Sequence, residues 1–308
     1  MRADIEQIMT SVRSVIKGKD EVIFKVLGAI IAGGHILLED IPGVGKTTLA
    51  LTISKTMSLK YHRVQFTPDV LPSDLLGFNM FNSATREFEY REGSVFCNIF
   101  LADEINRTSP KTQSALLEVM EEGKVTVDGV TRPLPKPFVV IATQNPFGSS
   151  GTQKLPESQL DRFMVRLSMG YPDHENAVNI LKGNVGAVLA ELTSTLTLEQ
   201  VKEMQEGADK IFVHNSVFDY IVRLTENTRN DNYFVTGLSP RASLSILKMA
   251  KAAAYMEGAQ FVLPEHVLAV FHETAIHRLT LCAKAKARGA TVISALDEIA
   301  AATKLPSA

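Results

Sequence analysis

A glycine-rich stretch, DIPGVGKTT at residues 40–48, holds the residue types that bind phosphate groups. It stands between a short apolar run and a helical pattern, which is the setting of a phosphate-binding loop. Gly43 and Gly45 let the backbone amides turn inward, so that Lys46 is expected to reach the terminal phosphates of a nucleotide and Thr47 to bind Mg²⁺. The candidate nucleotide-binding residues are Pro42, Gly43, Val44, Gly45, Lys46, Thr47 and Thr48.

The first glycine of the strict pattern G-x-x-x-x-G-K-[ST] is replaced by Asp40 in this chain. Asp tolerates unusual turn conformations, so the loop is expected to keep its function with the carboxylate pointing away from the nucleotide. The alternative is an ordinary glycine-rich turn, against which the G-K-T-T run between a strand and a helix argues.

Two further apolar runs end in polar residues that suit nucleotide hydrolysis. In NIFLADEINR (98–107), Asp103 is expected to support the metal ion and Glu104 to polarise the attacking water. In FVVIATQNP (138–146), Asn145 is expected to hold that water near the γ-phosphate. Each segment alone would be a routine surface turn, but their order along the chain favours one site.

Two arginines extend this set. Arg162, in LPESQLDRF (155–163), precedes a strand-like run and is expected to reach the γ-phosphate of a neighbouring subunit as an arginine finger. Arg241 follows Ser239 and Pro240, which suit the cap and first turn of a helix. Each arginine could instead form a local salt bridge. If Arg162 acts on a neighbour, the monomer is catalytically incomplete and an oligomeric ring follows.

Five short apolar runs predict the strands of a parallel sheet that is buried on both faces. They cover residues 35–39, 61–66, 97–102, 138–142 and 163–168. Helical patterns separate several of them, the clearest at 109–123 with Ser109 as its cap and Gly123 at its end. The fold class is therefore α/β, with a nucleotide-binding domain expected over residues 1–172.

Beyond residues 170–176 the apolar pattern becomes helical throughout. Helices are predicted within residues 197–212, 215–229, 239–258 and 264–281, with one weaker helix after Gly289. Thr197 and Gln200 form a capping box at the first of these helices. We expect residues 173–308 to form an all-helical lid and tail.

The composition of the 308 residues indicates a soluble globular protein, with 45% hydrophobic and 21% charged residues. A formal net charge of -2 gives no overall attraction to nucleic acid or to anionic membranes. The longest uncharged apolar run, 26–38, is too short to span a bilayer. The N-terminal residues lack a signal-peptide pattern, and Cys97 and Cys282 do not suggest a disulfide framework, so a cytoplasmic protein is expected.

Six segments in the same order resemble the MoxR family of AAA+ ATPases, over about residues 15–281. They are LLEDIPGVGKT, QFTPDVLPSDLLG, FLADEINRTSPKTQSALLEVMEEGKVTVDG, FVVIATQNP, LPESQLDRF and LSPRASLSIL. The resemblance implies a five-stranded AAA+ core followed by a helical lid, with ATP between them and assembly into a hexameric ring. It also implies an insert in the second helix, at about 78–93, and a hairpin before the first sensor, at about 125–137.

The resemblance further implies a chaperone-like remodeller that hydrolyses ATP to ADP and acts on a protein client. Members of the family often work beside a partner with a von Willebrand factor A domain, in maturation or metal-cofactor insertion. The D-x-S-x-S metal motif of that domain does not occur in this chain, so the partner would be a separate protein.

The family pattern also assigns roles to matching residues, in agreement with the chemistry above. It makes Lys46 and Thr47 the phosphate and Mg²⁺ ligands, Asp103 the carboxylate on the metal side, Glu104 the water-activating base, Asn145 the first sensor, Arg162 the finger and Arg241 the second sensor. Whether Arg241 acts in its own subunit or in a neighbour's stays open. Arg107 lies close to the acidic pair, where it could face the subunit boundary.

Three alternatives share most of these residues. The chain could be a slow nucleotide switch that signals to a partner, or a magnesium-chelatase-type motor subunit. It could also be a DNA motor that places its hairpin on the duplex. Lys124, Arg132 and Lys136 give that hairpin few basic residues for such a role, which argues against nucleic acid as the partner.

Overall fold

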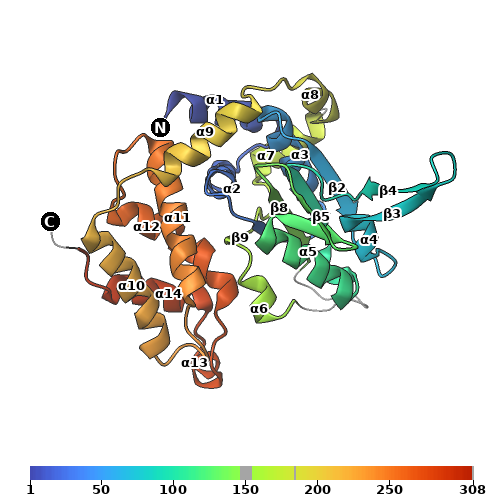
Figure 1. Ribbon diagram of the computed structural model, residues 1–308. Helices are drawn as coiled ribbons and strands as arrows, with labels where there is room; N and C mark the ends of the chain where they lie inside the picture. The colour runs from blue at the N-terminus through green and yellow to red at the C-terminus, as the bar shows by residue number, and fades with distance from the viewer. Residues whose placement is uncertain (146–154, 184, 307–308) are drawn as a thin grey trace.

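The computed structural model describes residues 1–145, 155–183 and 185–306. An α/β part carries the predicted sheet, and a helical part packs beside it (Figure 1). In the described ranges, no helix is both long enough and apolar enough to cross a membrane.

Five parallel strands form the central sheet in the order β2-β5-β8-β1-β9. They are β1 (Ile36–Glu39), β2 (Tyr61–Gln65), β5 (Ile99–Asp103), β8 (Val139–Gln144) and β9 (Val165–Leu167). All five positions of β5 are buried, as are all but the last of β8. The prediction of five buried parallel strands is confirmed, since apolar side chains on both faces suit a sheet that is covered on both sides.

The strand order decides where the ends of the strands meet. Strand β1 lies between β8 and β9, and β8 lies between β1 and β5. The carboxyl ends of β1, β8 and β5 are therefore adjacent at one edge of the sheet. Ligands bind at this edge in open α/β sheets, at the point where the strand order reverses.

Helices cover the sheet of the α/β part, and one of them, α5, has both of the capping signals that the sequence predicts. They are α1 (Ala3–Val15), α2 (Asp20–Ile31), α3 (Lys46–Thr56), α4 (Pro72–Leu76), α5 (Pro110–Glu122), α6 (Glu157–Leu160) and the short 3₁₀ helix η1 (Ile105–Arg107). At α5 the Ser109 hydroxyl accepts a hydrogen bond from the Thr112 amide, and Gly123 ends the helix with a φ of 62°. Both predicted signals of α5 are thus confirmed.

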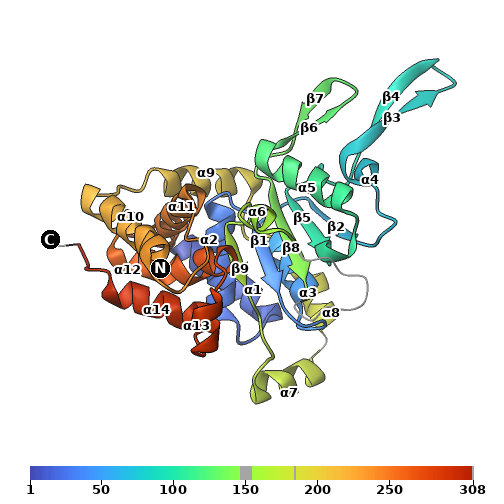
Figure 2. The same cartoon turned by 90° about the horizontal axis from the view of Figure 1, so that it is seen from below.

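Two antiparallel hairpins project from the same side of the α/β part (Figure 2). The first joins β3 (Gly77–Asn82) to β4 (Glu87–Glu92) and coincides with the predicted insert at 78–93. The second joins β6 (Lys124–Val127) to β7 (Val130–Pro133) through Asp128 and Gly129, whose φ values are 49° and 77°. Positive φ at both turn residues is what an Asp-Gly hairpin turn adopts, so the predicted second hairpin is confirmed.

Every helical segment predicted beyond residue 176 contains a helix. These helices are α9 (Leu198–Asp209), α10 (Asn215–Asn230), α11 (Pro240–Glu257), α12 (Pro264–Ala275) with η2 (Ile276–Arg278), and α14 (Val292–Ala302). The structure adds α7 (His174–Lys182), α8 (Val185–Glu191) and α13 (Ala283–Ala287), which were not predicted. The Thr197 and Gln200 side chains cap α9 reciprocally, as predicted. The expectation of an all-helical lid is confirmed.

The two parts share one apolar core. Helix α2 contacts both α9 and α11, and α12 contacts β9. Buried side chains of α2 such as Leu27, of β1 such as Leu38 and of α11 such as Met249 belong to the same hydrophobic cluster. The lid is therefore held against the β9 side of the sheet by apolar packing.

Candidate nucleotide site and arginine cluster

The predicted phosphate loop leaves β1 at its carboxyl end and leads directly into α3. Gly43 and Gly45 have φ values of 85° and 95°, a left-handed region that residues other than glycine rarely adopt. Gly45 caps α3, so the free amides at the start of that helix face the loop. A helix start of this kind attracts anions, because its free N–H groups and its dipole both favour negative charge.

A pocket of about 350 Å³ opens above this loop and collects most of the predicted residues. Its lining is Pro42, Gly43, Gly45, Lys46, Thr47, Thr48, Asp103, Glu104, Thr143 and Asn145. Val44, also predicted, lines a neighbouring pocket instead. The carboxyl ends of β1, β5 and β8 thus bring together groups that lie about 100 residues apart in the sequence, such as Lys46 and Asn145.

Lys46 is almost fully buried, and its ammonium group points across the ends of the strands. It donates to the carbonyl oxygens of Asp40 at 2.6 Å and Ile41 at 3.3 Å, and to Asn145 Oδ1 at 3.3 Å. Burial lowers the pKa of Lys46, although the nearby carboxylates of Asp40, Asp103 and Glu104 act in the opposite direction. The contacts hold the cationic head at the mouth of the loop.

Thr143 on β8 organises the acidic pair, and the sequence analysis missed it. Its hydroxyl donates to Asp103 Oδ1 at 2.6 Å and accepts the backbone amide of Glu104 at 2.8 Å. Glu104 itself adopts a left-handed conformation, with φ 57° and ψ 50°. Strained backbone of this type is concentrated at functional sites, where surrounding contacts such as those of Thr143 hold it in place.

Three side chains donate to the Glu104 carboxylate. Asn145 Nδ2 reaches Oε1 at 3.0 Å, while Gln65 Nε2 at 3.0 Å and Arg107 Nη1 at 2.8 Å reach Oε2. The expected proximity of Arg107 to the acidic pair is confirmed. Asn145 bonds to Lys46 as well as to Glu104, so it links the phosphate loop to the end of β5.

The oxygen donors of the pocket fit a hard divalent cation such as Mg²⁺. Thr47 and Asp103 line the same pocket, and Mg²⁺ is usually held by one or two protein oxygens, with phosphates and water completing its shell. Over the described part of the chain, no group of three His, Cys, Asp or Glu side chains could hold a metal alone. Asp103 Oδ2 accepts from Arg63 Nη2 at 2.7 Å, so a cation there would share this carboxylate with Arg63.

A second pocket of about 550 Å³ lies on the other side of the phosphate loop and is largely apolar. Val15 and Ile16 from the end of α1, Val44 from the loop, and Ile180 and Leu181 from α7 contribute to its walls. An apolar slot next to a phosphate site suits the base of a nucleotide. Among its lining residues, only Gly43, Val44, Gly45 and Thr48 could be predicted from the sequence, because no local motif marks the others.

Asp40 turns its side chain away from the phosphate pocket, as expected. Its Oδ2 accepts from the Ser168 hydroxyl and from the amides of Met169 and Gly170, at 3.1, 2.5 and 2.8 Å. Its φ is outside the left-handed region, so the backbone here does not require the glycine of the strict pattern. The expected explanation for Asp40, that it tolerates an unusual turn conformation, is therefore wrong. Its side chain instead binds the start of the segment that leads to the lid.

Arg162 and Arg241 meet at a different place. Arg162 Nε donates to Glu121 Oε2 at 3.0 Å, and Arg241 Nη2 donates to Glu121 Oε1. These bonds, first from Arg162 and then from Arg241, lower the pKa of Glu121. We call these three residues the Glu121 cluster; none of them is among the described residues that line the phosphate pocket.

The sheet order, the phosphate loop and the acidic pair at the end of β5 define a P-loop ATPase of the AAA class with a helical lid. Residues 35–165 match the ATPase family associated with various cellular activities (AAA), and residues 226–299 match the AAA lid domain.

Relatives extend the similarity to nearly the whole chain. Chaperone MoxR1 of Mycobacterium tuberculosis is 38% identical over 90% of this chain and 76% of that protein. A protein of Bacillus subtilis named YeaC is 42% identical over 96% of this chain and 92% of its own length. The crystal structure of a proposed ATPase from Cytophaga hutchinsonii superposes with a TM-score of 0.90 at 36% identity, covering 99% of this chain and 95% of that one. The chain belongs to the MoxR family of AAA+ ATPases.

Proposed function

We propose that this protein binds Mg-ATP in the phosphate pocket and hydrolyses it to ADP and phosphate. The observation that carries the proposal is the convergence of the phosphate loop, the acidic pair and Asn145 in one pocket. In this proposal Lys46 contacts the β- and γ-phosphates, and the amides of residues 43–48 surround them. Thr47 and Asp103 hold Mg²⁺, which neutralises charge on the phosphate oxygens when bound.

Glu104 then serves as the base for the attacking water. Its carboxylate lies within 3.0 Å of the Asn145 amide, so the two side chains can orient one water between them and the γ-phosphate. Glu104 accepts the proton of that water as the bond to phosphorus forms. Positioning and charge neutralisation contribute most of the rate in this type of reaction.

We further propose that the active form is a ring, with six subunits as the resemblance implies. Neither Arg162 nor Arg241 is among the described residues that line the pocket of its own chain, which supports a role for both at the pocket of a neighbour. Both form ion pairs with Glu121, the local salt bridges that are the alternative role, so the proposal requires that assembly exchange these pairs for a phosphate. We assign Arg162 as the finger and Arg241 as the second sensor in this shared site. Residues 1–172 form the nucleotide-binding domain of each subunit and 173–308 its lid.

The ring would act in the cytoplasm as a chaperone-like remodeller of a protein client. The name of the relative Chaperone MoxR1 supports this activity. The β3–β4 hairpin supports it too, because Phe78, Phe81 and Phe88 on it are about half exposed or more, at 47%, 54% and 73%, and could contact apolar client segments. A separate partner with a von Willebrand factor A domain follows from the resemblance alone.

ATP turnover across a series of protein concentrations tests the shared site. The rate per subunit should rise as the protein assembles, and Glu104→Gln and Arg162→Ala should bind ATP with little turnover. Normal turnover by monomeric Arg162→Ala would reject the finger. If the wild type bound ATP without cleaving it, the slow-switch alternative would replace the motor.

A further inference from the structure

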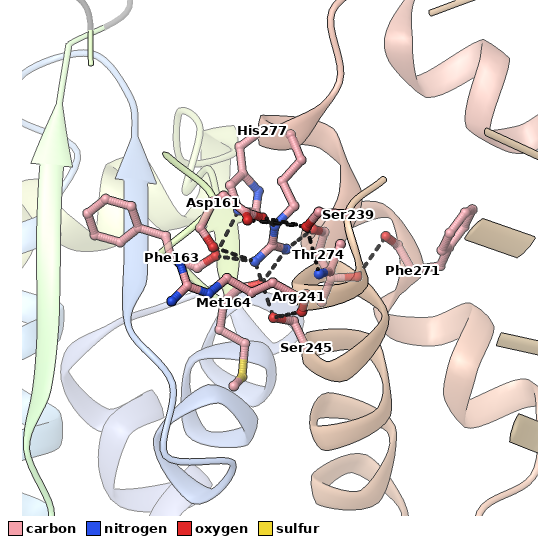
Figure 3. A network of polar contacts seen from close by, with 11 residues as sticks. Asp161, Phe163, Met164, Ser239, Arg241, Ser245, Phe271, Thr274 and His277 are labelled. Atoms are coloured by element: carbon pink, nitrogen blue, oxygen red, sulfur yellow. Dashed lines mark hydrogen bonds and ion pairs between the residues drawn. The ribbon is translucent and has the colours of Figure 1, made fainter. Parts of the chain in front are cut away.

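A buried arginine outside the phosphate pocket joins the two parts of the molecule. Arg278, the last residue of η2 in the lid, has a side chain that is only 3% exposed. Its polar contacts belong to a network whose labelled residues in Figure 3 come from the segment that leads into β9 and from the lid. A buried guanidinium needs several acceptors and a counter-charge, and Arg278 has both.

On the side of the α/β part, Arg278 binds the residues on either side of Arg162. Its Nε donates to Asp161 Oδ1 at 2.7 Å, and its Nη2 donates to the carbonyls of Asp161 at 3.2 Å and Phe163 at 2.7 Å. Its Nη1 also reaches the carbonyl of Met164 at 3.3 Å. These contacts fix the backbone from which the Arg162 side chain leaves.

On the side of the lid, the same network reaches the helix that carries Arg241. Arg278 Nη2 donates to Ser245 Oγ at 3.2 Å, one turn after Arg241 in α11. Ser239, the cap of α11, donates to the Asp161 carboxylate at 3.2 Å (Figure 3). Asp161 therefore accepts from both Arg278 and the start of α11, two residues before Arg241.

In the described part of the chain, the network around Arg278 binds neither the Arg162 nor the Arg241 guanidinium group, and both of these groups meet at Glu121. Arg162 and Arg241 approach Glu121 from the two parts of the molecule, with side chains 28% and 42% exposed. Arg278 and Asp161 lie behind them, with side chains 3% and 24% exposed. A buried, multiply bonded pair is harder to displace than the partly exposed pairs at Glu121.

We propose that Arg278 is a positioning residue that clamps residues 161–164 to α11, so that Arg162 and Arg241 reach the neighbouring subunit as one rigid unit. This inference rests on the proposed shared site. A movement of the lid would then move both arginines together. Arg278 would contact neither nucleotide nor water, and its effect would be seen at the pocket of the neighbour.

The variant Arg278→Lys tests this role. Lysine keeps the charge, but it lacks the planar fork that reaches several acceptors at once. We expect turnover to fall at least about ten-fold, because misplacing a reacting group by about 1 Å can cost roughly a hundred-fold. The affinity of Arg278→Lys for a fluorescent ATP analogue should stay within about two-fold of the wild-type value. A ten-fold change would need a loss of about 1.4 kcal/mol in binding free energy, and Arg278 makes no contact with the described residues of the pocket that could supply it. Arg223→Lys, which changes another ion-paired lid arginine, is the matched control.

Mixed assemblies separate positioning from general damage. A Glu104→Gln subunit lacks the base but keeps both arginines. An Arg278→Lys subunit keeps an intact pocket, so an excess of Glu104→Gln subunits should supply it with correctly placed arginines and restore turnover there. Adding Arg162→Ala subunits should restore nothing, because neither variant supplies a correctly placed finger. Asp161→Asn keeps an acceptor oxygen, so it should lose less turnover than Arg278→Lys and be rescued by the same subunits. This variant replaces Arg278→Lys in the test if Arg278→Lys does not fold.

The outcomes distinguish this inference from the proposed function. If Glu104→Gln subunits rescue Arg162→Ala but not the Arg278 and Asp161 variants, the positioning role is wrong while the shared site stands. Wild-type turnover by Arg278→Lys would also overturn the positioning role. If Arg162→Ala by itself retains full turnover, the shared site fails, and the inference fails with it.

Discussion

The phosphate pocket and the Glu121 cluster are both made of charged side chains, yet they are assembled in different ways. The pocket forms where three adjacent strands end, and Thr143 bridges two of these ends from a buried position. The Glu121 cluster joins α5 to residues 41 and 120 positions further along the chain, the second of them in the lid. The pocket therefore depends on the sheet and on the loop that leads from β1 to α3, whereas the Arg241 side of the cluster depends on how the lid packs against the sheet.

This difference suggests a division of labour between subunits. Asn145 contacts both Lys46 and Glu104, so one chain supplies the groups that we propose bind and cleave the nucleotide. Arg162 and Arg241 contact Glu121 at the surface. In the proposed ring, the phosphate of a nucleotide bound to the neighbouring subunit would replace the Glu121 carboxylate as their partner. The pocket should control binding and the cluster should control turnover, a separation that the following variants test.

The largest effect is expected at the lid end of the cluster. Arg241→Ala should lower turnover roughly a thousand-fold, the scale of an arginine that stabilises charge in phosphoryl transfer. Nucleotide affinity in a dilute, unassembled sample should be unchanged, because Arg241 would act on a neighbour. Arg288→Ala, at an exposed lid position, is the control. Weaker binding by the dilute variant would place Arg241 at the pocket of its own chain and contradict the division between a pocket that controls binding and a cluster that controls turnover.

Removal of the pocket lysine should affect binding instead. Lys46→Ala should weaken the affinity for a fluorescent ATP analogue roughly a hundred-fold, because it removes charge-assisted hydrogen bonds to phosphate. The loss should be the same in dilute and in assembled samples. Lys60→Ala, an exposed lysine before β2, should bind normally. An affinity loss confined to assembled samples would show that binding also depends on the neighbour.

Restoring the strict loop pattern should destabilise the protein. Asp40→Gly leaves the amides of Met169 and Gly170 without their carboxylate partner, and an unpaired buried donor costs about 2 kcal/mol. Urea unfolding should show a lower free energy of unfolding by about this amount. Asp69→Gly, in the turn after β2, is a surface control. Unchanged stability would mean that water replaces Asp40 at the start of the linker to the lid.

The smallest effect is expected from the shared acceptor of the cluster. Both ion pairs of Glu121 are partly exposed, and pairs of this kind contribute at most about 1 kcal/mol. Glu121→Gln should therefore change turnover less than about five-fold and the free energy of unfolding by less than about 1 kcal/mol. Glu122→Gln, the adjacent helix position, gives the comparison. A hundred-fold loss would make Glu121 a part of the active arrangement of the arginines.

Most of the fold could be predicted because its signals are local. Unbroken apolar runs predicted all five strands, and Ser109 with Gly123 predicted the limits of α5. The convergence of Lys46, Asp103 and Asn145 followed as well, since the carboxyl ends of neighbouring parallel strands must lie together. Thr143 and Gln65 were missed because a single polar residue in or at the end of a strand has no distinguishing pattern.

The sequence by itself thus determined the type of fold, the phosphate loop and the set of residues that could act on a nucleotide. Tertiary structure alone decided what Asp40 and Arg278 do, and that Arg162 and Arg241 meet at Glu121. Asp40 binds Met169 across 129 positions, and Arg278 binds Asp161 across 117. The Asp40 contact arises when β1 and β9 pair in the sheet, and the Arg278 contact arises when the lid packs against the sheet, because burial then leaves each polar group one set of partners within reach.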